Sequence, residues 1–177
     1  MSYWKLMSSF DSFEAVQALE KTITWNESEP GYYSLSFSEW PAEVKDLADV
    51  ATKFLANIGE SRVQVSKADY DFPGVVHADY DQYNVYDPEI GHNRFIKDYV
   101  SRIDNPWGTL RFVLFLNKSK MRVEINKDII HPKSGDLFWV EHYAPHWFIN
   151  ESEDSRYQIV LDIDTHQKLS INPSLHI

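Results

Sequence analysis

The chain has 177 residues, 43% of them hydrophobic and 15% aromatic, so it can bury a core without disulfides, and we expect one globular domain over residues 1–177. Lys and Arg total 17 against 27 Asp and Glu, and a formal charge of −10 makes nucleic acid an unfavourable partner. The sequence has no apolar run long enough to span a bilayer and no basic, then apolar, targeting pattern at its start, which predicts a cytoplasmic protein without a membrane partner. Because cysteine is absent, metal ligands would be His, Asp or Glu.

Residues 1–60 are predicted to be a helical support. Asp11 and Glu14 have the spacing of a capping box, and apolar residues then recur at helical spacing, which predicts a short first helix. A longer helix is predicted between Ser38 and Gly59, because a single apolar stripe runs through this segment. The stripe consists of Val44, Leu47, Ala48, Ala51, Phe54, Leu55 and Ile58.

Residues 61–164 are predicted to form a barrel, because the apolar period changes towards two and turn residues separate short segments. The strands expected after residue 70 are Gly74–Tyr80, Leu110–Leu116, Met121–Asn126, Leu137–Val140, Trp147–Asn150 and Arg156–Ile163. An amphipathic helix is expected as an insertion at residues 88–103, and residues 165–177 as a tail. Short strands that follow helices favour a mainly β fold, a sandwich or barrel with helices packed on one face.

Three side chains are candidates for a metal site. His77 and Asp79 lie two residues apart on a predicted strand, so they would point to the same side. His146 is the best third ligand, because it begins an aromatic strand and lies ten residues before Arg156. Two imidazoles and one carboxylate leave coordination positions open, which is typical of non-haem Fe(II) sites that use oxygen. The alternative for the first pair is a solvated His and Asp near a strand end.

The order of these residues resembles the Fe(II)- and 2-oxoglutarate-dependent oxygenase superfamily, and within it the branch of aspartyl/asparaginyl β-hydroxylases and free-proline hydroxylases. The resemblance rests on His77-Ala78-Asp79, Arg111-Phe112-Val113-Leu114-Phe115-Leu116, Gly135-Asp136-Leu137-Phe138-Trp139, His146, and Arg156 followed by Ile159-Val160-Leu161-Asp162. It implies a double-stranded β-helix, a jelly-roll barrel of the cupin kind. It also implies that His77, Asp79 and His146 bind the metal and that Arg156 and Arg111 contact the cosubstrate. The branch often has a His at the position of Val113.

A physical argument for Arg156 stands beside the resemblance. 2-Oxoglutarate is a dianion, and its distal carboxylate matches the planar fork of a guanidinium. The alternative for Arg156 is an ion pair with Asp154 or Glu153 at the strand end. For Arg111 the alternative is an ion pair with Glu124 across a hairpin.

The resemblance implies an enzyme that uses Fe(II), 2-oxoglutarate and O2 to hydroxylate an unactivated carbon of a small molecule, such as an amino acid, or of a peptide side chain, with release of succinate and CO2. No catalytic residue beyond the metal ligands is expected. Because Asp79 fills the carboxylate position, hydroxylation is favoured over halogenation.

Arg94 and Arg102, on the expected inserted helix, are candidates to contact a substrate carboxylate, and Trp139 is a candidate wall of the substrate pocket. A solvated helix face and core packing are the alternatives. Two rival functions remain at this point: a cupin-like metal enzyme that does not use 2-oxoglutarate, and a non-catalytic module that binds a small acid or a protein. Arg156 argues against the first rival, because such an enzyme does not require a cation there, and the intact set of metal ligands argues against the second.

Overall fold

The computed structural model describes residues 3–55, 59–70, 72, 74, 83–87, 92–96, 109–117, 120–142 and 144–165. Its elements in chain order are β1 (Trp4–Ser9), α1 (Phe13–Glu20), β2 (Asn26–Glu29), β3 (Tyr32–Leu35), a turn of 3-10 helix (Phe37–Glu39), α2 (Ala42–Leu55), β4 (Gly59–Ala68), β5 (Tyr83–Asp87), β6 (His92–Ile96), β7 (Thr109–Phe115), β8 (Met121–Ile125), β9 (Asp128–Ile130), β10 (Asp136–Val140), β11 (His146–Asn150) and β12 (Arg156–Thr165). Within the described part, no helix is long and apolar enough to cross a membrane.

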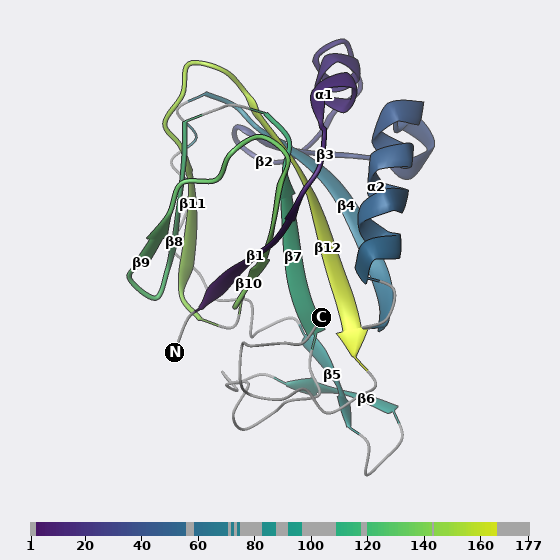
Figure 1. Cartoon of the computed structure of the whole chain (residues 1–177), viewed down its shortest axis with the longest axis vertical. Coiled ribbons are helices and arrows are strands. Elements are labelled where there is room, and N and C mark those ends of the chain that lie inside the picture. The colour runs from purple at the N-terminus through teal and green to yellow at the C-terminus, as the bar shows by residue number, and fades with distance from the viewer. Residues whose placement is uncertain are drawn as a thin grey trace.

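The strands form a large and a small antiparallel sheet and a separate hairpin. The large sheet has seven strands in the order β1-β10-β7-β12-β4-β3-β2, the small sheet has the order β11-β8-β9, and β5 pairs with β6. Figure 1 shows the small sheet on one side of the large sheet and α2 on the other. The predicted architecture, mainly β with helices on one face, is confirmed.

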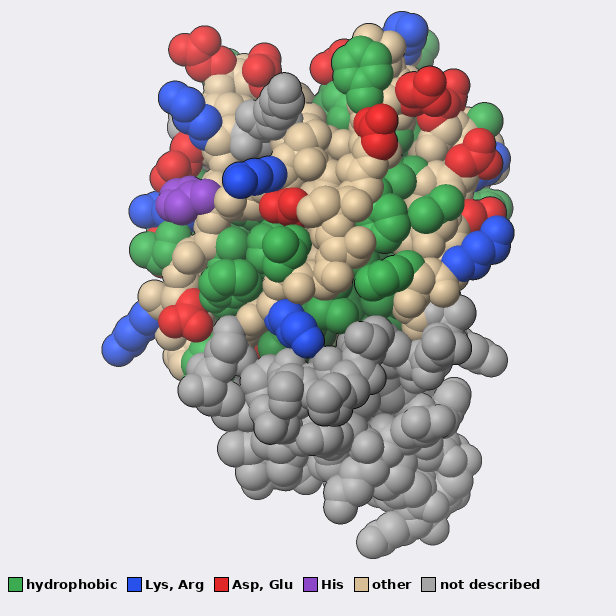
Figure 2. Space-filling model, viewed as in Figure 1, with side chains coloured by type: hydrophobic (Ala, Val, Ile, Leu, Met, Phe, Trp, Pro, Cys, Tyr) green, Lys and Arg blue, Asp and Glu red, His purple; other side chains and the backbone are tan. Residues whose placement is uncertain are grey.

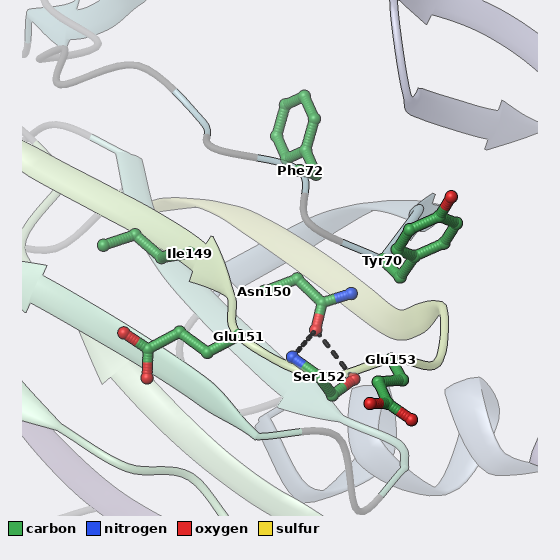
Figure 3. A pocket seen from close by; sticks show the side chains of 7 residues that line it. All are labelled: Tyr70, Phe72, Ile149, Asn150, Glu151, Ser152 and Glu153. Atoms are coloured by element: carbon green, nitrogen blue, oxygen red, sulfur yellow. Dashed lines mark hydrogen bonds between the residues drawn. The ribbon is translucent and has the colours of Figure 1, made fainter.

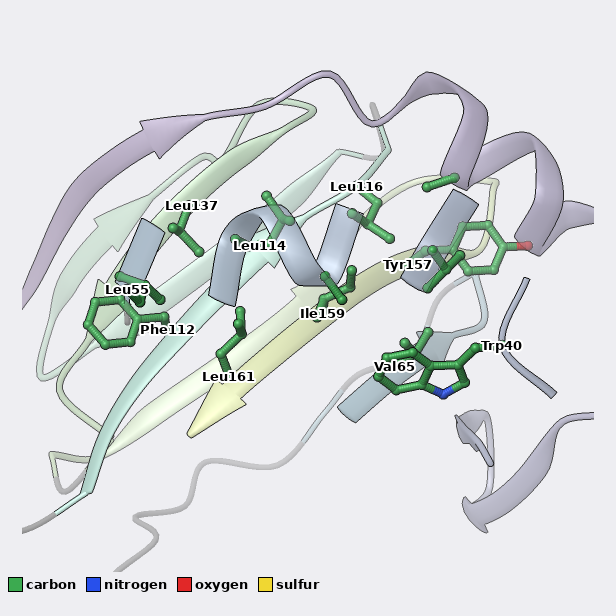
Figure 4. Close-up of a cluster of buried hydrophobic side chains, with 14 of the residues drawn as sticks. Trp40, Leu55, Val65, Phe112, Leu114, Leu116, Leu137, Tyr157, Ile159 and Leu161 are labelled. Carbon is green, nitrogen blue, oxygen red and sulfur yellow. The ribbon is translucent and has the colours of Figure 1, made fainter. Parts of the chain in front are cut away.

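The two faces of the large sheet bury different clusters. Along β12, Tyr157, Ile159, Leu161 and Ile163 belong to a helix-side cluster that also contains the buried stripe of α2 (Figure 4). A second cluster, between the sheets, joins Val113 and Phe115 of β7 to Val123 and Ile125 of β8. Because side chains alternate along a strand, Arg156, Gln158, Val160 and Asp162 face away from the helices. The inter-sheet space therefore receives every second residue of β12.

The prediction for α2 is confirmed, since Val44, Ala48, Ala51 and Leu55 are buried on one face. The short first helix is confirmed as α1, and there the Asp11 carboxylate accepts a hydrogen bond from the amide of Phe13 at 3.0 Å. Residues 1–60 are not simply helical, however. They also contain β1, β2 and β3. β1 pairs with β10 and β3 with β4, which are distant in the chain, whereas β2 pairs with the adjacent strand β3. Backbone hydrogen bonds to distant partners made β1 and β3 strands, and the local sequence pattern did not indicate these partners.

The prediction of a helix at residues 88–103 is wrong for residues 92–96, the part of this segment that the structure describes. Residues 92–96 are strand β6, which pairs with β5 from Tyr83↔Ile96 to Asp87↔His92. The spacing of His92, Phe95 and Ile96 fits a helix, but a segment this short fits a strand equally well once a partner satisfies its backbone. Residues 88–91 and 97–103 lie outside the described residues. So does the strand expected at Gly74–Tyr80, apart from Gly74, which belongs to no strand.

The other predicted barrel strands are confirmed as β7, β8, β10, β11 and β12. β9 was not predicted, because it has only three residues. It follows β8 through Asn126 and Lys127, both with positive φ, which is the geometry of a tight hairpin turn.

Candidate functional site

The small sheet presents His146 and Phe148 to the inter-sheet space. His146 pairs with Ile125 and Phe148 with Val123, and both partners belong to the inter-sheet cluster. Residues paired across antiparallel strands share a face, so the two side chains point towards the large sheet. His146 begins its strand directly after Pro145, as the sequence predicted.

The surroundings of His146 suit a metal ligand. The side chain is 3% exposed, and its Nδ1 lies 3.0 Å from the carbonyl oxygen of Ala144. A carbonyl only accepts hydrogen bonds, so Nδ1 carries a proton, and in the neutral form of the ring Nε2 would be the nitrogen that binds a metal. A second ring nitrogen held by a backbone carbonyl is the usual arrangement around a metal-binding histidine.

Arg156 is a buried cation inside the fold. The residue is 2% exposed, one guanidinium nitrogen lies 3.6 Å from the Met121 sulfur, and no other hydrogen bond from the guanidinium is found in the described part of the chain. Its Nε is buried without a partner there, and no described carboxylate pairs with it. The alternative of an ion pair with Asp154 or Glu153 is therefore excluded. Burial lowers the pKa of Arg156 to about 10, so the side chain stays charged at neutral pH.

Phe148 connects the two candidate residues. Its ring centroid lies 5.6 Å from that of His146 in an edge-to-face contact, and 5.8 Å from the guanidinium carbon of Arg156. His146 comes from the small sheet and Arg156 from the large sheet. The structure thus brings one predicted metal ligand and the predicted cosubstrate anchor to the same aromatic ring.

Further polar groups lie beside Arg156 and were not predicted from the sequence. Gln158 pairs in register with Ser66 of β4, and both are at least 96% buried. The Gln158 amide nitrogen lies 3.4 Å from the Tyr32 hydroxyl, whereas Gln158 Oε1 and Ser66 Oγ lack a hydrogen-bond partner among the described residues. Unsatisfied buried polar atoms are rare and call for a ligand or water. A sequence signal existed, since Gln158 is a polar residue at an inward position of an apolar strand.

Arg111 has a carboxylate partner. Its Nε and one terminal nitrogen donate to the two oxygens of Asp162 at 2.8 and 2.9 Å, between paired positions of β7 and β12. The partner is thus Asp162 and not Glu124, which instead lies 3.4 Å from Arg122. Contact of Arg111 with the cosubstrate stays a prediction.

The substrate contact predicted for Trp139 needs correction. Trp139 belongs to the helix-side cluster and is 6% exposed. It pairs with Phe112, another member of that cluster, so it points away from the inter-sheet space that holds His146 and Arg156. Core packing, the alternative considered above, describes it.

For the remaining predicted site residues, the structure describes no side chain. His77, Asp79 and Arg102 are not among the described residues, and Arg94 is described only as a position of strand β6. Convergence of His77 and Asp79 with His146 stays a prediction.

A loop that precedes Arg156 is fixed by Asn150. The buried Asn150 amide nitrogen donates to the carbonyl oxygens of Asp69 and Asp154, both at 2.9 Å, and its oxygen accepts from the amide and hydroxyl of Ser152 (Figure 3). Asn150 and Ser152 line an open pocket of about 420 Å³. Its lining consists of Tyr70, Phe72, Ile149, Asn150, Glu151, Ser152 and Glu153. Asn150 thereby joins the end of β4 to the start of β12 and positions Arg156.

No family model matches the chain, and no curated protein matches it in sequence. Solved structures do match. HygX from Streptomyces hygroscopicus, with nickel and 2-oxoglutarate bound, superposes with a TM-score of 0.60 at 9% identity, over 93% of this chain and 84% of that chain. A prolyl hydroxylase from Trichoplax adhaerens, in complex with a peptide fragment of hypoxia inducible factor, gives 0.57 at 12% identity, over 92% of this chain and 84% of that chain.

A third match is the viral collagen prolyl hydroxylase of Paramecium Bursaria Chlorella virus-1 in its 2OG complex, with a TM-score of 0.56 at 11% identity, over 94% of this chain and 97% of that chain. At such identities the likeness shows the fold. The chain has the double-stranded β-helix, or jelly-roll, fold predicted from the sequence. The branch of aspartyl/asparaginyl and free-proline hydroxylases stays a prediction.

Proposed function

We propose that this protein is an Fe(II)- and 2-oxoglutarate-dependent dioxygenase that hydroxylates an unactivated carbon of a small molecule, such as an amino acid, or of a peptide side chain, and releases succinate and CO2. One observation carries the proposal. Arg156 is a buried cation without a carboxylate partner in the described part of the chain, and it shares an aromatic neighbour with His146.

The buried guanidinium favours an anionic ligand. A charged group inside a protein is costly unless an opposite charge or several hydrogen bonds accompany it. Arg156 retains unsatisfied donor capacity, and the buried hydroxyl of Ser66, which lies opposite Gln158 in the paired strand, can donate as well. The distal carboxylate of 2-oxoglutarate supplies the missing charge and accepts two parallel hydrogen bonds from a guanidinium. The solved structures with 2-oxoglutarate on the same fold give this ligand further support.

The donor set fits a ferrous ion. His146 would bind through Nε2, and His77 and Asp79 would complete two nitrogen ligands and one carboxylate. A bound ferrous ion would supply the activation of O2 and of the substrate C–H bond. Arg156 would orient the cosubstrate, and the apolar cluster around Val123, Ile125 and Phe148 would exclude water from the reaction.

The test is anaerobic addition of Fe(II) and 2-oxoglutarate, followed by the visible charge-transfer absorption of the chelate. We expect the band in the wild-type protein, and we expect Arg156→Met to need far more 2-oxoglutarate to develop it. Arg122→Met is the matched control, because Arg122 is a partly exposed residue of β8 that pairs with Glu124 and Glu151. It should behave like the wild type.

Each other outcome identifies a rival. Absence of the band in the wild type would favour a cupin-like metal enzyme that does not use 2-oxoglutarate if Fe(II) still binds, and a non-catalytic binding module if it does not. Once the band is seen, amino acids and peptides can be screened for O2-dependent, substrate-stimulated release of succinate.

A further inference from the structure

A groove separates α1 from α2 on the helix side of the large sheet. It has a volume of about 290 Å³ and is remote in the fold from the inter-sheet space that holds His146 and Arg156. Its lining, which we call the α1–α2 groove, consists of Phe10, Asp11, Glu14, Ala15, Glu43, Asp46, Leu47 and Val50. Half of these side chains are apolar and half are carboxylates.

The carboxylates of the α1–α2 groove have no basic partners among the described residues. In the part of the chain that the structure describes, Asp11, Glu14, Glu43 and Asp46 form no ion pair, and the groove lining contains neither Lys nor Arg. Figure 2 shows acidic side chains gathered among apolar ones over α1 and α2. In a chain with a formal charge of −10, these four carboxylates repel anions and attract cations.

α2 carries a second apolar stripe beside the carboxylates of the α1–α2 groove. Leu47, Val50 and Phe54 recur at three- and four-residue steps, beside the buried stripe of the same helix. Val50 is 50% and Phe54 42% exposed. The Phe54 ring packs edge-to-face on Phe10, which lines the groove, at 5.9 Å, and Phe13 nearby in sequence is 65% exposed. Apolar side chains thus continue from the groove along the exposed side of α2.

We propose that the α1–α2 groove docks an amphipathic helical segment of a partner protein, with apolar anchors at helical spacing and Lys or Arg on both flanks. The apolar side chains of the groove pack against the apolar anchors, as in other helix-in-groove complexes, and the four carboxylates pair with the basic flanks. A second copy of this chain fits less well, because each copy carries the same negative charge. An anionic membrane is disfavoured for the same reason.

The proposal is tested by titrating the isotope-labelled protein with a synthetic amphipathic peptide of about 18 residues, five helical turns, built from Leu and Lys. A peptide with Glu in place of Lys is the control ligand. We expect amide shifts confined to α1, α2 and Phe10 with the Lys peptide, weaker binding at higher salt, and no binding of the Glu peptide.

Two variants with the same change in net charge separate specific docking from general attraction. Glu14→Lys/Asp46→Lys alters the groove, whereas Glu27→Lys/Glu29→Lys alters the exposed strand β2. We expect the groove variant to weaken binding at least about tenfold and the β2 variant less than about threefold. Val50→Ser/Phe54→Ser should also weaken binding while the protein stays folded, since both side chains are exposed.

Several results would overturn the proposal. These are no binding of the Lys peptide, equal losses in the two charge variants, or amide shifts elsewhere on the molecule. Concentration-dependent self-association that buries α1 and α2 would assign the groove to a second copy of the chain. Binding to anionic vesicles through the same residues would assign it to a lipid surface.

Discussion

Replacement of Arg156 by Met should make the ligand-free protein more stable and deprive it of 2-oxoglutarate binding. Burial lowers the pKa of the guanidinium from its ordinary value to about 10, which corresponds to an unfavourable free energy of about 3 kcal/mol for the charged form. Apolar replacement of buried charges stabilises other proteins by about 1–4 kcal/mol. We expect a gain of about 1–3 kcal/mol, and about 2–4 °C in Tm for each kcal/mol at this chain length.

Thermal unfolding with and without 2-oxoglutarate, in the presence of a redox-inert divalent metal, measures both effects. At a concentration one hundred times Kd, 2-oxoglutarate should stabilise the wild type by about 2.7 kcal/mol and leave Arg156→Met unchanged. Arg122→Met should keep the ligand-induced rise in Tm and gain no stability of its own. A variant at Arg156 that is less stable than the wild type would show that the guanidinium has a stabilising partner. One that keeps the rise in Tm would refute its role as the anchor.

Three further predictions concern other parts of the chain. Asp79→Ala should abolish turnover, and undiminished succinate production by this variant would refute Asp79 as a metal ligand. Asp162→Asn should lower the free energy of unfolding by about 1 kcal/mol, because it weakens a partly buried bidentate pair with Arg111. A variant whose free energy of unfolding in urea equals that of the wild type would contradict this. Gly135→Ala should cost more than about 2 kcal/mol in the same assay, because Gly135 has φ +84 and an added Cβ would overlap the Phe10 carbonyl oxygen, so a loss below 1 kcal/mol would be unexpected.

The elements that the sequence predicts well are those whose pattern is long and one-sided. The apolar stripe of α2 and the alternation of β12 belong to elements of ten residues or more, so their period is unambiguous. The segment His92–Ile96 is too short for its period to decide between helix and strand, and its pairing with β5 decided for strand. β1 pairs with β10 across most of the chain, and local sequence contains no sign of that partner.

The candidate site shows the same division between local and distant information. His146 and Arg156 could be chosen from the sequence, because their residue types and order point to a metal and an anion. Gln158 shows in the sequence only as a polar residue on an apolar strand, and Ser66 could not be chosen, because what distinguishes it is its position opposite Gln158 in the β4–β12 register. The error at Trp139 has a similar origin. Its aromatic character is visible in the sequence, but the face of β10 on which it lies follows from strand pairing.

The contrast between Arg111 and Arg156 shows how strand pairing decides whether an arginine has an internal counter-charge. Both lie on strands of the large sheet and alternate with residues of the helix-side cluster. The residue opposite Arg111 is Asp162, which takes two of its hydrogen bonds, whereas the β4 residue opposite Arg156 is Ala68, whose methyl group accepts none. The small side chain at position 68 leaves the guanidinium without an internal counter-charge in the described part of the chain. A ligand with a carboxylate can therefore form with Arg156 the ion pair that Asp162 forms with Arg111.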